Sequence, residues 1–473
     1  MIVNEDPFRR TMGWPLHTGG CGDDVHQDPA WVARQMGTFI SFYALGCALT
    51  APFAGWISDR LGRWKTIWIG IAVFVVGGVM QSAANGYEVL TAGRLVAGVS
   101  IGVLSMVIPL YIAELAPVHM RGAMVALQQI GITFGAMLSS IWCMIIQAIE
   151  LEWGWRLEFG MQLILVVIMA VGMVFMPESP RWLVNNGQPE KARALLKKLR
   201  GAKGEEATNR EMEEIEEEAK DYAAQNGSWL ELFSRKVVFA TLVGCLVPIF
   251  QQLTGINAMM TQSSSIYSAM CLPGKSMTLV MNAVNFLATF GSIFTTDKLG
   301  RKRLLLLSSG AIFLFLMGFA GINWGINVSQ NAPAAYGVLV LSYLYIIAFA
   351  NAWGPLGWII PAEVFPLRVR GKGVGLATFF NWMGNFAVTF ITPIAINGTL
   401  GVGGYMAVFA CLMGFIVAPS VFFLFPETKN VPLEEMEAHF DKPFGEYVRS
   451  NATDLVRRRP AQSEDVTCPD AKV

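Results

Sequence analysis

Eleven long apolar segments restrict what this chain of 473 residues can fold into. Each is close to the ~20 apolar residues that an α-helix needs to cross the hydrocarbon core of a bilayer. A backbone inside a bilayer must satisfy its own hydrogen bonds, so such segments fold as helices. The sequence therefore predicts an all-α membrane protein. The predicted spans lie near residues 35–57, 66–84, 88–112, 122–149, 155–176, 237–270, 274–296, 304–325, 333–362, 370–398 and 404–425.

The composition agrees with this class of protein. Charged residues make up 15% of the chain, whereas soluble proteins carry nearer ~25%. Lys and Arg together number 35, as do Asp and Glu, so the net charge does not indicate nucleic-acid binding. The seven cysteines show no CxxC or Cys/His spacing, so neither a zinc site nor a disulfide framework is predicted. No nucleophile–base set or phosphate-binding loop indicates an enzyme, and no cofactor is expected.

The polar connectors between the spans indicate the orientation of the chain. Basic residues gather in every second connector, for example around Arg63, Arg121 and Arg301, whereas alternate connectors such as 85–87 carry few. The positive-inside rule places the basic connectors in the cytoplasm. With eleven spans, the C-terminus is then predicted to be cytoplasmic and the N-terminus extracellular.

A five-residue charged signature occurs twice. Asp59-Arg60-Leu61-Gly62-Arg63 is repeated as Asp297-Lys298-Leu299-Gly300-Arg301, and each copy lies between two apolar segments. Equivalent charged turns in two apolar halves indicate duplicated bundles, a plan common among carriers of small solutes. The predicted divisions are a polar N-terminal segment at 1–34, an N-terminal transmembrane bundle at 35–176, a cytoplasmic helical linker at 177–236, a C-terminal transmembrane bundle at 237–426 and a cytoplasmic tail at 427–473.

The two bundles are predicted to be unequal. One span precedes the first signature and two precede the second, which makes five spans in the first bundle and six in the second. Residues 1–34 contain no apolar run that could span a membrane and no signal-peptide core. Relative to a symmetric plan, the first bundle therefore lacks its first helix, either truly or because the sequence is truncated.

The linker and the tail carry most of the polar sequence. Stretches 190–200 and 205–220 are strongly charged and are predicted to be helical. A packed helical pad is favoured over a solvated linker, because several side chains could form apolar faces. The tail is predicted to be disordered from about Ser450. The side chains for the pad are Trp182, Leu195, Leu196, Leu199 and Ile215.

Further motifs resemble those of the sugar porters of the major facilitator superfamily, most closely the fungal members. They cover roughly residues 35–430 in the family's order. The resemblance implies the major facilitator fold, with two pseudo-symmetric bundles that give alternating access to a central site. Besides the two signatures, the motifs are Gly93-Arg94-Leu95, Pro109 to Pro117 with Arg121-Gly122, Pro177 to Trp182, Gln251-Gln252 to Asn257, Trp353 to Trp358 with Glu363 and Arg370, and Pro426 to Lys429.

The polar residues within the spans suggest a sugar site. A sugar presents hydroxyl groups and apolar faces, so it needs amide side chains and an aromatic plate. A single amide in a span is more often helix–helix glue, but a cluster favours a cavity. Asn385 shares a helix face with Asn381 and is a further candidate. By resemblance, the substrate-contacting positions are Gln129, Gln251, Gln252, Asn257, Asn285, Trp358 and Asn381.

Two helix breaks are predicted at this site. Gln252 and Asn257 are five residues apart and would point ~140° apart on an ideal helix. Gly255 offers a break that could direct both to one cavity. A second break is predicted in the helix that carries Trp358. Both are predicted to be gate elements, with static kinks as the alternative. The residues that predict the second break are Gly354, Pro355, Gly357 and Pro361.

Charged residues form a second functional set. By family analogy they make ion pairs that hold the outward-open state, with solvated loop charges as the alternative, since exposed pairs contribute only ~0–1 kcal/mol. Arg94 lies inside a span and needs a partner. The resemblance implies an aspartate on the first helix of proton-coupled members, so symport and facilitated diffusion both stay open. The set is Asp59, Arg63, Arg94, Glu114, Arg121, Glu178, Arg181, Asp297, Arg301, Glu363, Arg370 and Glu427.

The predicted function is transport of a monosaccharide or related polyol across the plasma membrane by alternating access. Thr261 and Gln262 stand where many family members have tyrosines, so the substrate is left open beyond a preference for neutral sugars. The expected partners are the sugar or polyol, protons and the lipid bilayer, with no nucleic acid and no metal. The alternatives are a sugar-sensing receptor on the transporter fold and a truncated, inactive transporter.

Overall fold

The computed structural model describes residues 5–16, 29–116, 121–149, 151–200, 228–429, 431 and 433–454, with short helical pieces at 208–209, 211–213 and 215–217. All regular elements among these residues are helices. Eleven helical stretches in this part of the chain are long and apolar enough to cross a membrane, which confirms the predicted number of spans.

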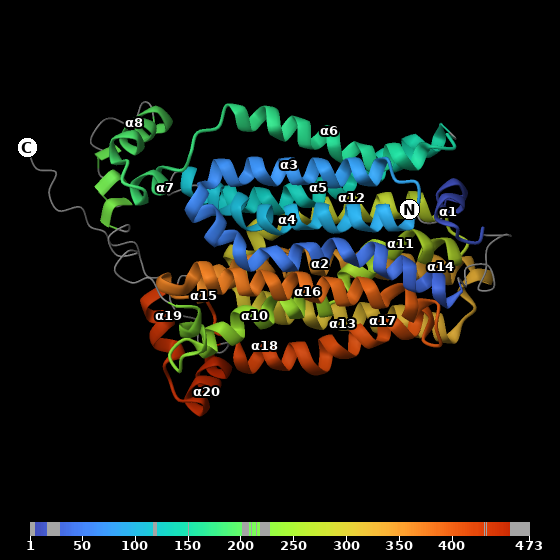
Figure 1. Ribbon diagram of the computed structural model, residues 1–473. Coiled ribbons are helices and arrows are strands. Elements are labelled where there is room, and N and C mark those ends of the chain that lie inside the picture. Colours follow the sequence, from blue (N-terminus) through green and yellow to red (C-terminus); the bar gives the residue numbers. More distant parts are fainter. Residues whose placement is uncertain are drawn as a thin grey trace, which may run out of the picture.

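The spans fall into two halves (Figure 1). The first half contains α2 (Ala30–Leu61), α3 (Arg63–Ser82), α4 (Tyr87–Leu115), α5 (Arg121–Ala148) and α6 (Gly154–Val174). In the second half, two spans are divided, α10 (Val238–Leu253) with α11 (Ile256–Ala269) and α14 (Ala332–Asn351) with α15 (Trp353–Val364). The others are α12 (Gly274–Leu299), α13 (Arg301–Gly325), α16 (Arg370–Ile396) and α17 (Gly401–Cys411), which continues through η8 (Leu412–Val417) into α18 (Ala418–Leu424).

Shorter helices mark the two ends of the bundle. At one end, here called the linker end, lie α7 (Pro180–Asn185), α8 (Pro189–Arg200), α19 (Leu433–Phe440) and α20 (Phe444–Asp454) (Figure 1). At the opposite end, here called the α1 end, lies α1 (Asp6–Met12). The 3₁₀ turns are η5 (Trp229–Phe233), η6 (Val328–Gln330) and η7 (Leu367–Val369).

Glycines allow the central helices to approach closely. α2 packs against α4 within the first half and against α16 of the second half, while α5 packs against α12. A Cβ atom at Gly98 would lie 2.1 Å from the Tyr43 carbonyl oxygen, and one at Gly37 would lie 2.4 Å from that of Phe390. Small residues of this kind let membrane helices pack through their backbones. The seam between the halves at α2 and α16 therefore depends on Gly37.

The linker helices form the packed pad that the sequence favours. Leu196 and Ile215 are buried with Leu183, Ala192 and Met212, and Trp182 and Leu195 pack against them. Leu199, the fifth residue predicted for this face, is 39% exposed, so that part of the prediction is wrong. Leu199 is on the same side of α8 as Leu196, three residues earlier, but it is the last residue but one of the helix and lies beyond the packed cluster.

Both terminal segments are more ordered than predicted. α20 extends to Asp454, so the predicted onset of disorder at Ser450 is wrong, and the rest of that tail lies outside the described residues. Residues 5–16, predicted only as polar sequence, include α1, whose Phe8 packs against Trp155 with ring centroids 5.5 Å apart. At each terminus the order comes from apolar contacts between residues that are distant in the sequence, Phe8 with Trp155 and Tyr447 with Phe239.

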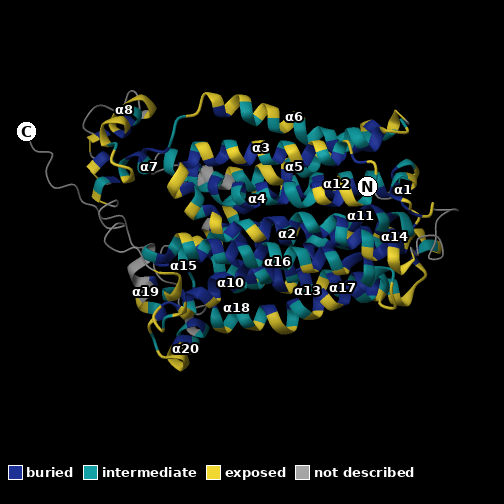
Figure 2. Cartoon of the chain, in the orientation of Figure 1, coloured by how far each residue is buried: buried dark blue, intermediate teal, exposed yellow. Residues whose placement is uncertain are grey.

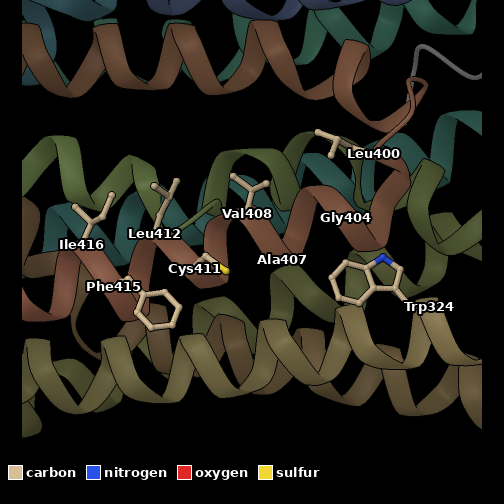
Figure 3. A pocket seen from close by; sticks show the side chains of 9 residues that line it. All are labelled: Trp324, Leu400, Gly404, Ala407, Val408, Cys411, Leu412, Phe415 and Ile416. Atoms are coloured by element: carbon tan, nitrogen blue, oxygen red, sulfur yellow. The ribbon is translucent and has the colours of Figure 1, made fainter.

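The outer faces of the spans suit contact with lipid. Figure 2 shows exposed residues along α6 and α18 and buried residues in α10 and α16. A groove of about 450 Å³ runs along α17 and η8, with Trp324 and Phe415 at its two ends (Figure 3). Its floor contains Gly404, Ala407 and Cys411. Since Trp324 is 63% and Phe415 is 72% exposed, we regard the groove as part of the lipid-facing surface.

One buried asparagine joins the second half to its C-terminal helices. Asn451 Nδ2 donates to the carbonyl oxygens of Phe423 at 3.3 Å and Leu424 at 3.2 Å, near the end of α18. Its Oδ1 lies 2.8 Å from His439 Nε2, and its carbonyl accepts from the buried Lys302 ammonium at 2.6 Å. Asn451 is fully buried.

Replacement of this asparagine is therefore expected to destabilise the linker end. Asn451→Ala would remove the amide that donates to the Phe423 and Leu424 carbonyls and that contacts His439 Nε2, which should cost about 1–3 kcal/mol. The measurement is the thermal unfolding midpoint of the purified protein in detergent. Asn186→Ala, at an exposed position of α7's C-terminus, should leave the midpoint within 1 °C of wild type. Equal midpoints for both variants would contradict the role given to Asn451.

Candidate functional site

A break in the first span of the second half builds the candidate site. α10 ends at Leu253 and α11 begins at Ile256, and between them Gly255 has a φ of +81°. Glycine adopts this left-handed conformation without steric cost. The Thr254 carbonyl at the break accepts a hydrogen bond from the Tyr345 hydroxyl at 2.9 Å. The predicted break at Gly255 is confirmed, and its role as a gate stays a prediction.

The break brings four of the predicted residues into one chain of hydrogen bonds, here called the amide network. Asn381 donates through Nδ2 to Gln251 Oε1 at 2.7 Å and accepts at Oδ1 from Gln252 Nε2 at 3.1 Å. Asn257 Nδ2 donates to Gln252 Oε1. Since Gln252 and Asn257 would point ~140° apart on a continuous helix, the break makes their contact possible.

Backbone atoms of α15 extend the amide network. Gln251 Nε2 donates to the carbonyl oxygens of Trp353 at 2.7 Å and Gly354 at 3.0 Å. A Cβ atom at Gly357 would lie 2.4 Å from Gln251 Nε2, so a larger residue here would displace the Gln251 amide from its present contacts. The network therefore ties α10, α15 and α16 together beside the break.

The second break differs in position from its prediction. α14 ends at Asn351, Ala352 has φ −131° and ψ −76°, and α15 begins at Trp353. The residues from Gly354 to Pro361 are helical, although the sequence predicts the break there. Pro355 is tolerated because it lies in the first turn of α15, where backbone N–H groups have no helical partner. The break thus precedes the glycine–proline motif.

The first half approaches the network through α5. Gln129 is half-buried, and its Nε2 would lie 3.4 Å from a Cβ atom at Gly354. A second polar contact between the halves joins Asn282 Nδ2 of α12 to Ser140 Oγ of α5 at 2.6 Å. The sequence reasoning missed Asn282 and Ser140. The spacing could have indicated the asparagine, because it precedes Asn285 by three residues on one helix face.

Several buried amide atoms at these helices lack a partner among the described residues. They are Asn285 Oδ1, Asn282 Oδ1 and Gln262 Nε2. Each residue is less than 8% exposed. A buried polar atom without a hydrogen bond costs about 1–3 kcal/mol. Such atoms are therefore available to a polar ligand.

Besides Gln129 and Asn285, two further predicted residues are not joined to the amide network. Trp358 of α15 and Asn385 of α16 are half-buried. Within the described part of the chain, neither side chain makes a hydrogen bond to Gln251, Gln252, Asn257 or Asn381. Trp358 follows Gly354 by four residues in α15, the helix whose Trp353 and Gly354 carbonyls accept hydrogen bonds from Gln251.

Arg94 of α4 lies between aromatic rings. Its guanidinium carbon is 4.6 Å from the centre of the Phe39 ring and 5.3 Å from that of Phe159. Its buried Nε has no hydrogen-bond partner in the described residues, and no carboxylate forms an ion pair with it there. Cation–π contacts of this kind stabilise a charge without neutralising it.

The first charged signature forms a compact cluster at the linker end. Arg63 pairs with Glu114 through two hydrogen bonds of 3.0 Å each and with Asp59 at 2.9 Å. The Glu178 carboxylate accepts from the backbone N–H groups of Arg63 at 2.9 Å and Trp64 at 3.1 Å, at the start of α3. A carboxylate at a helix N-terminus is favourable.

The second signature repeats this cluster. Arg301 pairs with Glu363 at 2.8 Å. Glu427 accepts from the backbone N–H groups of Arg301 at 2.8 Å and Lys302 at 3.2 Å, at the start of α13. Gly62 and Gly300 both have positive φ values, +93° and +85°. In each copy, the glycine turns the chain so that the following helix presents its N–H groups to the glutamate.

The remaining residues of the charged set are placed as follows. Arg370 donates to the Phe365 carbonyl at 3.2 Å and forms no ion pair with a described carboxylate. Arg181 lies on α7 at the linker end. The side chains of Arg121 and Asp297 lie outside the described part of the structure. The ion pairs described here therefore lie within one half each.

Comparison with known proteins identifies the family. The family model described as "Sugar (and other) transporter" matches residues 4–440. The chain belongs to this sugar transporter family. The family comprises transporters rather than enzymes, and the eleven apolar helices agree with an integral, multi-pass membrane protein.

Individual relatives agree with this assignment. One is the glucose transporter GlcP of Staphylococcus epidermidis, 31% identical over 417 residues, which are 87% of this chain and 90% of that protein. Another is the H(+)/hexose cotransporter 2 of Parachlorella kessleri, 32% identical over 423 residues, which are 86% of this chain and 76% of that protein.

A solved structure confirms the predicted fold. The major facilitator superfamily proton:xylose symporter XylE, bound to 6-bromo-6-deoxy-D-glucose, matches with a TM-score of 0.73 at 26% identity. The match covers 86% of this chain and 89% of that chain. The transporter therefore has the major facilitator fold, with two helical halves.

The break at Gly255 gives a direct test of this geometry. Gly255→Ala would force a Cβ atom to a positive φ and to within 2.7 Å of the Phe409 ring. We expect a loss of about 1–3 kcal/mol of stability, measured as a lower thermal midpoint in detergent. The matched control is Gly310→Ala on α13, where a Cβ meets nothing within 4 Å. If both variants melt like wild type, the strain assigned to Gly255 is absent.

Proposed function

We propose that this transporter moves a neutral monosaccharide or related polyol by alternating access, with the amide network as the centre of its substrate site. The observation that carries the proposal is the break at Gly255. It gathers Gln251, Gln252, Asn257 and Asn381 in the second half, with Gln129 of the first half beside Gly354.

The chemistry of the network favours a polyhydroxylated substrate. Amides both donate and accept, which matches hydroxyl groups. The four network side chains carry no charge, so they offer no counter-ion to an anionic or cationic solute. The unpartnered amide atoms of Asn285 and Gln262 add an acceptor and a donor on α12 and α11. We assign Trp358 the role of an apolar plate, which its half-buried position permits.

The names of the relatives support a monosaccharide. They include a glucose transporter, an H(+)/hexose cotransporter and a proton:xylose symporter. We therefore rank hexoses and pentoses first. Two of these three proteins are named for proton coupling, which makes symport the first hypothesis for this chain as well.

The orientation follows from the charges. The linker end carries both signature clusters, so by the positive-inside rule we place it, with the C-terminus, in the cytoplasm. We place the α1 end outside a plasma membrane, of a fungal cell if the motif resemblance holds. Since the described ion pairs of the two signatures each lie within one half, we assign the clusters to keeping each half rigid while the halves move against each other.

Uptake measurements test the proposal. In a yeast strain without hexose transporters, this chain should restore uptake of labelled glucose or xylose. Gln252→Ala and Asn381→Ala each remove network hydrogen bonds and should reduce uptake ~10- to 100-fold. The matched control is Asn323→Ala on α13, an amide that bonds only its own helix, to the Phe319 carbonyl at 2.9 Å, and that should keep wild-type uptake.

The same experiment separates the alternatives. Sugar binding by the purified protein without uptake would indicate a receptor on the transporter fold, whereas neither binding nor uptake would indicate an inactive chain. Uptake that collapses when an uncoupler is added would support symport. Equal uptake by all three variants would remove the amide network from the substrate site.

A further inference from the structure

A second polar cluster lies at the α1 end, away from the amide network. Gln147 of α5 donates through Nε2 to a Glu5 carboxylate oxygen, to Glu158 Oε1 at 3.1 Å and to Cys143 Sγ at 3.1 Å. Glu5 immediately precedes α1, and Glu158 lies in α6. Lys275, at the start of α12 in the second half, places Nζ 3.9 Å from Glu5 Oε1.

The two carboxyl groups share a confined space. The ligand atoms of Glu5, Glu158 and Cys143 lie within 4.8 Å of one another, and Gln147 Nε2 donates to both carboxylates. The Glu5 side chain is only 12% exposed. Glu158 Oε2 and Gln147 Oε1 are buried without a partner among the described residues. A carboxyl group this close to a second one ionises only at a cost, which favours the protonated form of Glu5.

Opposing charges around the pair are weak. The groups that face Glu5 from the packed helices are Glu158 of α6, Gln147 and the Cys143 thiol of α5, and Lys275 of α12. Lys275 is the one cation among them in the described residues, and its side chain is 43% exposed. At 3.9 Å with this exposure, it compensates only part of the repulsion between two ionised carboxylates.

The pair sits where the N-terminal segment meets the bundle. Phe8, Met12 and Trp14 are buried against side chains of α2, α4 and α6. The Trp14 indole donates to Gln35 Oε1 at 2.6 Å. Glu5 is thus the polar end of an otherwise apolar attachment, and its contacts reach both halves of the transporter.

We propose that Glu5, beside Glu158 and Gln147, is a proton-binding site that holds the N-terminal segment against α5 and α6 while Glu5 carries a proton, and weakens its attachment when Glu5 ionises. This inference goes beyond sugar transport and does not depend on the amide network. The same atoms could attract a metal cation, but the nearby ammonium of Lys275 and the Gln147 amide that donates to both carboxylates favour a proton.

The pH dependence has a defined sign. Burial, and next the charge of Glu158, raise the pKa of Glu5 from 4.5 to about 7, while Lys275 partly opposes this. A raised carboxyl pKa stabilises the docked segment at low pH, and this contribution is lost as the pH rises. The docking equilibrium should therefore weaken by up to ~tenfold per pH unit between about pH 4.5 and 7 and level off above pH 7.

Hydrogen exchange of the intact protein tests the proposal. The protein, in lipid nanodiscs with EDTA, is exchanged from pH 5 to pH 8, and protection of residues 5–16 is expressed relative to a free peptide of that sequence. In the wild-type protein, protection of residues 5–16 should decrease as the pH rises from 5 to 7 and should then stay constant. In the Glu5→Gln variant, residues 5–16 should stay protected up to pH 8, with no dependence on pH. In the Glu158→Gln variant, the decrease in protection should occur at lower pH than in the wild-type protein.

Asp6→Asn is the matched control, because Asp6 is an exposed acid next to Glu5; it should keep the wild-type profile. Should Glu158→Gln fail to fold, Glu5→Gln decides alone, and labelling of Met12→Cys by an impermeant maleimide gives a second readout. The proposal is overturned if Glu5→Gln follows the wild-type profile, or if wild-type protection does not change with pH. Greater protection in a parallel sample without EDTA than in the EDTA sample at the same pH would show a metal site instead.

Discussion

The hydrogen bonds of Asn381 are the constraint on which the central part of this transporter depends. Asn381 bonds Gln251 and Gln252, two consecutive side chains that an intact helix would point ~100° apart. Both residues lie in the helical part of α10, which ends at Leu253, and they reach Asn381 at different atoms, Gln251 at Nδ2 and Gln252 at Oδ1. Buried amides must be satisfied, so the break, the glycines around it and the approach of α15 and α16 follow from one requirement. This arrangement also leaves amide atoms of neighbouring helices available to a substrate.

The two charged signatures solve a different problem, the turn between consecutive spans. In each, a glycine with positive φ starts a helix whose first N–H groups bind a distant glutamate, Glu178 or Glu427. The glutamate comes from the segment that follows the last span of its half. Each cluster therefore closes its own half, which suits two bodies that move against each other. Among the described residues, contacts between the spans of the two halves include small residues and neutral polar groups, such as Gly37 and the Asn282–Ser140 pair.

At the α1 end, the role of a polar residue depends on a partner that is distant in the sequence. In the sequence, Glu158 is one carboxylate in an apolar span and Glu5 is part of a polar segment. A rule that intramembrane charges are functional would have selected Glu158. Its partner could not be found in this way, because Glu5 is brought to it by the apolar packing of Phe8, Met12 and Trp14. Cys271 gives a similar case, since it is disulfide-bonded although the cysteine spacing predicts no framework.

The sequence by itself determined the class of fold, the number of spans, the family and the break at Gly255, because hydropathy, motif order and glycine placement are local properties. It also identified the members of the amide network, although only through resemblance. The tertiary structure alone decided which amides bond one another, that the second break falls at Ala352, and that the described ion pairs of the two charged signatures stay within one half each. It also placed Asn282, Glu5 and the C-terminal helix α20. These features depend on side chains from distant segments meeting in space, and a linear pattern of residues contains no distances between helices.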